Sequence, residues 1–287
     1  MRASIVIGTL NRPQVVLKLL LQLINQSKSV DFEVLVYDQS TAENYKKLQN
    51  QFPKQENFKL IHLDKPNTCR YLNLGWKNGS SEIVLYLDDD VTITEKTITE
   101  HIKKYDDKSI LGVAGRVIND KEKTLRSTQV GKIISFGAII KKNFFSKYSG
   151  FVDFPYGCNM SFRKSILKEF NGFDERLQPP IHSFNEVDLG CRITKRFPKS
   201  IFFNKEALVY HHRYKFGGTR SYSEKEVNDS NQFNYGYSLG KNFTLLENIL
   251  CFIRRLPYQL IKEPGAITQI FKGYFYAKKF KFKILNF

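Results

Sequence analysis

Three consecutive aspartates, Asp88, Asp89 and Asp90, follow the apolar run "IVLYL" at residues 83–87. Adjacent carboxylates repel one another, and each is costly to desolvate at the edge of a core. A divalent cation would offset this repulsion, because magnesium and manganese bind carboxylate oxygens and are shared with substrate phosphates. The D-x-D spacing places Asp88 and Asp90 on one side of an extended chain. The run therefore predicts a divalent-cation site; the alternative is a solvated loop in which Asp90 caps a helix.

Polar residues also follow two earlier apolar runs. The segment "GTLNRP" ends the first run with Thr9, Asn11 and Arg12, and "YDQS" ends the second with Asp38. We expect Asn11 to cap a helix whose free N–H groups favour a phosphate. Asp38 is suited to hold a nucleotide ribose or base.

The elements that must position these residues alternate between strands and helices. Strands are predicted at 3–8, 32–38, 58–63 and 83–87, and helices at 13–25, 42–52 and 70–78. After the aspartates, residues 93–105 are predicted to be helical, with Thr92 and Glu95 spaced as a capping box. Such alternation indicates an α/β fold with a mostly parallel central sheet and helices on both faces.

The second half of the chain has a mixed pattern. Strand-like pieces are predicted at 110–118 and 131–140, and helices near 163–170 and 186–196. Open α/β sheets bind ligands outside the carboxyl ends of their strands. The polar residues that follow the first-half strands therefore define the predicted site.

Composition limits the partners. The 287 residues carry a formal net charge of +17, so an anionic partner is expected, such as nucleic acid, an acidic membrane surface or a phosphorylated substrate. The four cysteines show no C-x-x-C spacing, which favours neither a zinc site nor a disulfide framework. Because no signal peptide and no run of about 20 apolar residues is visible, we expect a reduced, cytoplasmic protein.

Several other classes fit the sequence less well. A dinucleotide-binding fold needs G-x-G-x-x-G, but Leu10 and Pro13 stand where its second and third glycines belong after Gly8. A P-loop is absent, and a sugar-1-phosphate nucleotidyltransferase needs a glycine-rich first loop. A basic nucleic-acid-binding protein conflicts with the aspartate run, which repels phosphates without a metal. A non-catalytic nucleotide-binding protein remains an alternative.

Six segments in order resemble the inverting nucleotide-sugar glycosyltransferases of family 2, which have the GT-A fold. The segments span residue 4 to about 220 and read "SIVIGTLNRP", "EVLVYDQS", "NLGWKNGSSEIVLYLDDDV", "YGCNMSFRKSILKEFNGFDERL", "FNEVDLGCRITKRF" and "ALVYHHRYKFGGTR". The chain departs from the family pattern at Leu10, where tyrosine is common, and at Leu72, where an arginine usually precedes the asparagine. Asn185-Glu186 replaces the usual Glu-Asp pair, which moves the expected base to Glu186.

The resemblance implies one displacement at the anomeric carbon of a sugar, with a UDP- or dTDP-linked donor, a saccharide or lipid-linked acceptor and Mn²⁺ or Mg²⁺ as cofactor. It implies a hexosyltransferase-type activity in cell-surface polysaccharide or glycolipid synthesis, and no nucleic-acid partner. Glu186 is the implied catalytic base, and Asp90, Asp88 and His211 are the implied metal ligands. The implied donor-binding residues are Thr9, Asn11, Arg12, Asp38, Arg70, Asp88 and Asp89, and Asn159 and Asp188 are expected on the acceptor side. Asp188 is also expected to pair with Arg192 on its helix, so its role is either structural or to orient the acceptor. Gly217, Gly218 and Arg220 either close over the diphosphate or form a plain loop.

We expect a catalytic domain at 1–220, divided into a nucleotide-sugar half (1–118) and an acceptor half (119–220), and a helical extension at 221–287. From Pro264 onward the extension has no acidic residue. Between residues 271 and 283, five lysines alternate with six aromatic residues: Lys272, Lys278, Lys279, Lys281, Lys283, Phe271, Tyr274, Phe275, Tyr276, Phe280 and Phe282. This composition suits an anionic membrane surface and predicts peripheral attachment to the inner face of the cell membrane; the alternative is a helix whose aromatic residues pack on the domain.

Overall fold

The computed structural model describes residues 3–119, 127–262 and 265–284, apart from the side chains of Leu256, 258–262 and 281–284. A nine-stranded sheet forms its centre, in the order β3-β2-β1-β4-β10-β6-β11-β5, with β9 paired to β11. The strands are β1 (Ala3–Thr9), β2 (Phe32–Asp38), β3 (Phe58–His62), β4 (Ile83–Asp88), β5 (Val91–Ile93), β6 (Gly112–Asn119), β9 (Gly150–Val152), β10 (Asn159–Arg163) and β11 (Ile201–His211). The first four strands along the sheet are parallel, whereas β10 is antiparallel to both of its neighbours. The predicted mostly parallel α/β fold is confirmed.

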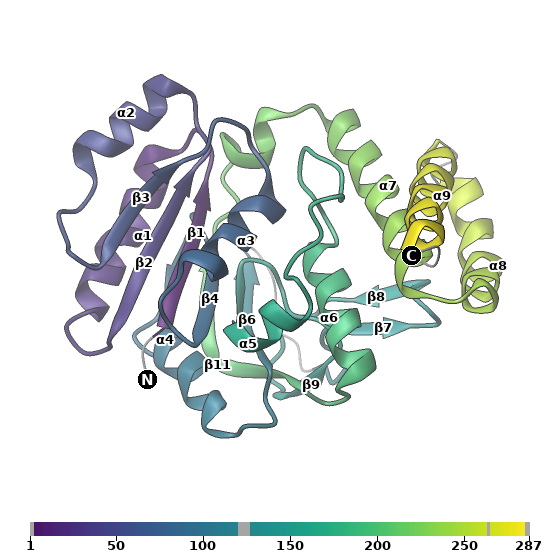
Figure 1. Ribbon diagram of the computed structural model, residues 1–287, viewed down its shortest axis with the longest axis horizontal. Coiled ribbons are helices and arrows are strands. Elements are labelled where there is room, and N and C mark those ends of the chain that lie inside the picture. Colours follow the sequence, from purple (N-terminus) through teal and green to yellow (C-terminus); the bar gives the residue numbers. More distant parts are fainter. Residues whose placement is uncertain (1–2, 120–126, 263–264, 285–287) are drawn as a thin grey trace.

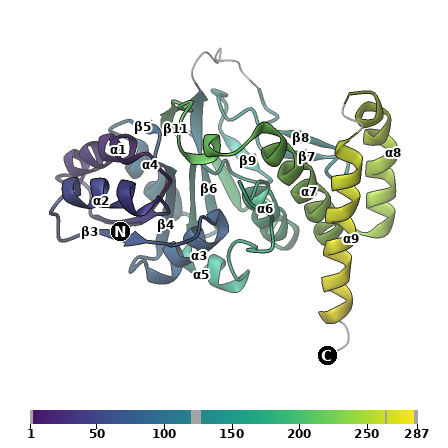
Figure 2. The same cartoon turned by 90° about the horizontal axis from the view of Figure 1, so that it is seen from above.

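Helices cover both faces of this sheet (Figure 1). Six of them accompany the strands: α1 (Pro13–Gln26), α2 (Ala42–Gln51), α3 (Thr68–Asn78), α4 (Thr97–Lys103), α5 (Lys164–Glu169) and α6 (Asn185–Arg196). Figure 2 shows α1 and α2 on one face and α3 and α5 on the other. Strand β1 is buried on both sides, as a parallel strand between two helical layers must be. Gly75 lets α3 approach β1, because a Cβ there would lie 2.5 Å from the side chain of Val6.

Two local predictions are wrong. The capping box at Thr92 and Glu95 does not form, because Val91–Ile93 are strand β5 and pair with β11; α4 begins at Thr97. Thr94 N–H instead donates to Thr97 Oγ1 (2.8 Å). The piece at 131–140 is not one strand but the first part of a hairpin of β7 (Lys132–Ile134) and β8 (Ile139–Lys141). The capping box fails because burial of Val91 and Ile93 against β11 stabilises a strand more than the local capping pattern stabilises a helix start.

Three helices follow the sheet: α7 (Glu224–Asn242), α8 (Leu245–Lys262) and α9 (Ala266–Ile284). Helices α7 and α9 pack against each other with their backbones in contact. A Cβ at Gly236 would lie 1.9 Å from the carbonyl oxygen of Ile270, and one at Gly273 would lie 2.0 Å from that of Phe233. Within the described residues, no helix is both long and apolar enough to cross a membrane.

Candidate active site

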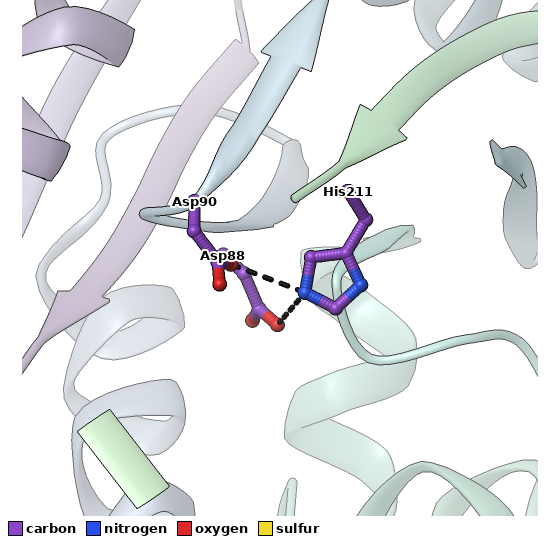
Figure 3. Close-up of side chains that lie close together, drawn as sticks. All are labelled: Asp88, Asp90 and His211. Atoms are coloured by element: carbon purple, nitrogen blue, oxygen red, sulfur yellow. Dashed lines mark ion pairs between the residues drawn. The ribbon is translucent and has the colours of Figure 1, made fainter. Parts of the chain in front are cut away.

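The pairing of β5 with β11 brings His211 to the aspartate run. Val91 lies opposite His211 in this ladder, and His212 N–H donates to the Asp90 carbonyl (3.0 Å). One ligand atom from each of Asp88, Asp90 and His211 lies within 4.8 Å of the other two. His211 Nε2 lies 3.1 Å from Asp90 Oδ1 and 3.8 Å from Asp88 Oδ2 (Figure 3). The structure thus brings together the three residues that the sequence resemblance implies as metal ligands.

Asp89 is not part of this cluster; it lies with Asp90 in the turn between β4 and β5. It accepts a hydrogen bond from Thr9 Oγ1 (2.6 Å) and two from the Arg12 guanidinium, whose Nη1 also donates to Asp90 Oδ2 (3.1 Å). Thr9, Arg12 and Asp89 therefore hold one another at the end of β1 and β4. A nucleotide contact by these three residues stays a prediction.

The charges of the cluster are unevenly compensated. Burial raises the pKa of Asp88 to about 6 and that of Asp89 to about 7, although His211 and Arg12 respectively oppose the shift. Burial alone would raise the pKa of Asp90 as well, but contact with charged His211, together with Arg12, lowers it. Burial disfavours protonation of His211, but the Cys158 sulfur and the two carboxylates outweigh it and raise its pKa to about 11. An added cation would favour the charged forms of all these carboxylates.

The cluster fits a divalent cation. His211 Nε2 lies 3.1 Å from the buried Asp90 Oδ1 as an ion pair, but within the described residues this oxygen has no hydrogen-bond partner. His211 Nδ1 lies 3.1 Å from Asn119 Oδ1. If Nδ1 donates there, the Nε2 lone pair faces the two carboxylates, as in a metal-bound histidine with its outer partner. Two carboxylates and one imidazole are a donor set that suits manganese or magnesium.

A cavity of about 470 Å³ extends from the aspartates to the start of α6 and is lined there by Asn185 and Glu186. Glu186 is the second residue of α6 and lies at the positive end of the helix dipole. Among the described residues, none donates a hydrogen bond to its carboxylate, although the side chain is only 8% exposed. Asn185 donates to the His182 carbonyl (2.9 Å), and its Oδ1 has no partner. The cavity therefore holds the cation-binding cluster and an uncompensated carboxylate.

A sequence-family model described as "Glycosyl transferase family 2" matches residues 4–170, which is more than half of the chain. The chain belongs to glycosyl transferase family 2. No curated protein sequence matches this glycosyltransferase.

Solved structures support the GT-A fold. Residues 1–349 of TarS from S. aureus in complex with UDP-GlcNAc match with a TM-score of 0.64 and 15% identity, covering 95% of this chain and 79% of that 1–349 chain. The mannosyltransferase PcManGT from Pyrobaculum calidifontis in complex with GDP-Man and Mn²⁺ matches with a TM-score of 0.59 and 14% identity, covering 95% and 73%. GalNAc-T7 with UDP, GalNAc and Mn²⁺ matches with a TM-score of 0.64 and 14% identity, covering 84% and 48%.

Asp188 of the transferase lies outside the cavity. It pairs with Arg192 (2.9 Å), which confirms the predicted pair, and it also binds Lys241 Nζ (2.9 Å) and Asn242 Nδ2 (2.9 Å). Burial opposes its ionisation, but Lys241 and Arg192 outweigh burial and lower its pKa. Asp188 thus fastens α6 to α7, and the structure gives it no contact with the acceptor side of the cavity.

Asn159 and Arg70 are not brought to the site either. The Asn159 side chain is fully buried and bonds to His101 Nε2 (2.8 Å) and to the carbonyl oxygens of Ala207 (2.8 Å) and Arg116 (3.1 Å). It therefore fastens strands together instead of facing an acceptor. Arg70 is exposed on α3 and does not line the cavity.

Asn11 does not cap α1, so that prediction is wrong. Its φ is +54°, and its Oδ1 accepts from Thr41 N–H (3.0 Å) and Asn44 Nδ2 (3.1 Å), so it fixes the start of α2 instead. Asp38 is buried at the end of β2 and accepts hydrogen bonds from Ser40. Its neighbour Gln39 lines the cavity in its place.

Sequence reasoning missed several residues that line the cavity. They include Tyr71, Tyr156, Arg213 and Tyr222. For Tyr71 the only hint in the sequence was the glycine at position 8, which indicates that a side chain packs closely there. A Cβ at Gly8 would lie 2.4 Å from the Tyr71 ring. Tyr156 and Arg213 flank Cys158 and His211 within segments that resemble the family. Tyr222 precedes α7, so the extension beyond residue 220 takes part in the site.

Proposed function

We propose that the protein is a metal-dependent inverting glycosyltransferase that moves a sugar from a UDP- or dTDP-linked donor to a hydroxyl group of a saccharide or lipid-linked acceptor. One observation carries the proposal: Asp88, Asp90 and His211 converge in the same cavity as the unpartnered Glu186 carboxylate. A diphosphate needs a cation beside these aspartates, and an attacking hydroxyl needs a base. Complexes of UDP-GlcNAc, GDP-Man and UDP in proteins of similar fold are in keeping with this proposal.

In the proposed reaction the acceptor oxygen bonds to the anomeric carbon as the bond from that carbon to the diphosphate oxygen breaks. Glu186 accepts the proton of the attacking hydroxyl. Asp88, Asp90 and His211 would hold Mn²⁺ or Mg²⁺, and such a cation would supply charge neutralisation for the leaving diphosphate. Arg12 fixes the direction of Asp90 through its hydrogen bond, and Asn119 orients His211. Gly218, Thr219 and Arg220 line the same cavity and can cover the donor.

Binding of UDP with and without metal tests the donor site. Calorimetry on the full chain should show much tighter UDP binding with Mn²⁺ than with chelator, and Asp90→Ala should abolish the difference. Asp106→Ala, which alters an exposed aspartate beside α4, is the matched control and should behave as the unaltered chain does. Equal UDP affinity with and without metal would contradict the metal dependence. A hydrolysis assay over a panel of nucleotide sugars with Mn²⁺ then identifies the donor.

We also propose peripheral attachment to an anionic membrane during cell-surface polysaccharide or glycolipid synthesis, with the contact on α8. Five of its apolar side chains are 46–67% exposed: Leu245, Leu246, Ile249, Leu250 and Ile253. Of the tail aromatic residues, Tyr274 is buried and Phe271 stacks on Phe252, whereas Phe275 is 64% exposed. The side chains of Lys281, Phe282 and Lys283 lie outside the described part of the chain. The exposed face of α8, flanked by the exposed cation of Arg254, suits an interfacial helix.

Vesicle co-sedimentation tests this attachment. The protein should sediment more with phosphatidylglycerol vesicles than with phosphatidylcholine vesicles, and a double change of Ile249 and Ile253 to serine should reduce sedimentation. Leu21→Ser, at an exposed leucine on α1, is the matched control. Equal sedimentation with both lipids, or no loss in the double variant, would contradict the proposal.

A further inference from the structure

A second cavity, of about 590 Å³, adjoins the donor cavity. The two share Lys142, Tyr156 and Arg213 in their linings, so they are neighbours separated by these side chains. The second cavity lies beside the β7–β8 hairpin, which Figure 1 shows between the central sheet and α8. The proposed chemistry uses only the first cavity.

The two cavities differ in charge. The donor cavity is lined by Asp88, Asp89, Asp90 and Glu186 as well as by cations. Of the described residues that line the second cavity, none is acidic and four are cations: Lys141, Lys142, Arg213 and Arg255. In the described part of the chain, no carboxylate lies within ion-pair distance of Lys141, Lys142 or Arg213. Cations gathered around one hollow favour an anion there.

The second cavity also has an aromatic wall. Tyr156 stacks on Phe144 with ring centroids 5.4 Å apart, and Lys142 Nζ lies 5.2 Å from the Tyr156 centroid. Arg255, on α8, lies 4.1 Å from the centroid of Tyr235, and both side chains line the cavity. Aromatic faces with a few fixed polar groups are typical of sites for organic ligands. The cavity thus suits an organic anion better than a bare ion.

The start of α6 joins the two cavities. Phe184 lines the second cavity, whereas the next two residues, Asn185 and Glu186, line the first. Phe184 has a left-handed backbone with φ of +68°, which turns the chain between them. The two cavities therefore meet at the turn that begins α6, two residues before the carboxylate that would accept a proton from an attacking hydroxyl.

We infer that the second cavity binds an anionic group of the acceptor, most simply a phosphate, while the hydroxyl to be glycosylated reaches Glu186. This inference rests on the proposed function and deepens it, because it specifies the chemical class of the acceptor. The phosphate can belong to a saccharide or to a lipid headgroup, since both offer the same anion to these cations.

Probe binding with the donor site saturated tests the inference. With UDP and Mn²⁺ bound, calorimetry would compare glucose 6-phosphate, glucuronate and methyl glucoside as probes on the full chain. We expect the phosphate sugar to bind at least tenfold more tightly than methyl glucoside, with glucuronate between them. Lys141→Glu should weaken glucose 6-phosphate binding at least fivefold. Lys168→Glu, at an exposed lysine of α5, should leave this binding unchanged.

The outcomes separate this inference from the proposed function. Failure of UDP to bind with Mn²⁺ would contradict the proposed function itself. Normal UDP binding with equal affinity for charged and neutral probes, or with no effect of Lys141→Glu, would overturn only the inference, as would displacement of glucose 6-phosphate by UDP. Phosphatidylglycerol vesicles distinguish the two sources. If Lys141→Glu weakens glucose 6-phosphate binding and vesicle binding alike, the phosphate belongs to a lipid headgroup; if it weakens glucose 6-phosphate binding and leaves vesicle binding unchanged, the phosphate belongs to a saccharide.

Discussion

Two regions of this transferase bury acidic side chains and compensate them differently. On α6, Asp188 is fully buried, but Arg192, Lys241 and Asn242 all bind it, and its pKa is lowered. At the end of β4, burial raises the pKa of Asp88 and Asp89, and Asp90 Oδ1 is left without a hydrogen-bond partner. A buried carboxylate that the protein's own cations neutralise, such as Asp188, stabilises the fold. One that it leaves short of positive charge is available to a ligand.

The sharpest contrast lies within the first turn of α6, where Glu186 faces the cavity and Asp188 faces α7. Glu186→Gln removes the proposed proton acceptor, so turnover should fall roughly 10²–10⁴-fold, while UDP affinity and the thermal midpoint stay nearly unchanged. Transfer rate, calorimetry and thermal unfolding of this variant would measure the three quantities. Glu43→Gln in the first turn of α2 is the matched control and should keep full turnover. Near-normal turnover of Glu186→Gln would show that the proton goes to another group.

Lys241→Met tests the compensated region. Lys241 Nζ binds both Asp174 (2.7 Å) and Asp188 (2.9 Å), so its loss leaves buried carboxylates short of a partner. The free energy of unfolding should fall by on the order of 3 kcal/mol, measured by urea denaturation. Lys225→Met, at an exposed lysine of the same helix, should change it little.

The same variant should also alter the response to acid. The pKa of Asp188 is lowered in the folded state, so the stability it contributes is present above its unfolded pKa of about 3.9 and is lost as pH falls through the lower folded value. Without Lys241 the folded pKa rises, so unfolding should begin at a higher pH than in the unaltered chain. An unchanged acid midpoint would mean that Lys241 does not compensate these carboxylates.

Asn119→Ala tests the outer partner of His211. If Asn119 holds the His211 ring with Nε2 toward the aspartates, its loss should weaken Mn²⁺ affinity about 10–100-fold without removing a ligand. Titration with Mn²⁺ in the presence of UDP would measure this. Asn50→Ala, at an exposed position of α2, is the control. Unchanged affinity would place His211 outside the metal site.

The smallest expected effect is a proton count. Because its pKa is raised to about 11, His211 is protonated near neutral pH in the absence of metal, and a cation must displace that proton. Mn²⁺ binding should therefore release about one proton, and its affinity should rise with pH. Calorimetry in two buffers with different ionisation enthalpies measures the release. No release in either buffer would show that His211 keeps its proton and is not a ligand.

Sequence patterns predicted the features that depend on short stretches of chain. The strands up to β4, the placement of Asp88 and Asp90 on one side, and the position of Glu186 in the first turn of α6 all follow from local spacing. The division of the chain at residues 118 and 220 stays a prediction.

The features that failed or were missed depend on distant partners. The motif around Asn159 predicts an acceptor-side role, but its side chain is hydrogen-bonded to His101 and to the Ala207 carbonyl, which belong to other elements. Asp188 and Lys241 lie on different helices, and no local sequence pattern predicts their ion pair. The second cavity likewise requires the β7–β8 hairpin, the start of α6 and α8 to meet, which single-sequence periodicity does not encode.

The antiparallel pairing of β5 with β11 has a consequence for the protein while it is being made. In the described sheet, β5 has β11 as its only strand neighbour, and β11 ends at His211. At about 5–20 residues per second, a ribosome needs roughly 6–24 s to extend the chain from Asp90 to His211. During that interval the aspartates are present without their histidine or the strand that fixes them. The nascent chain can therefore acquire a three-ligand cation site only after the ribosome has added His211, 121 residues beyond Asp90.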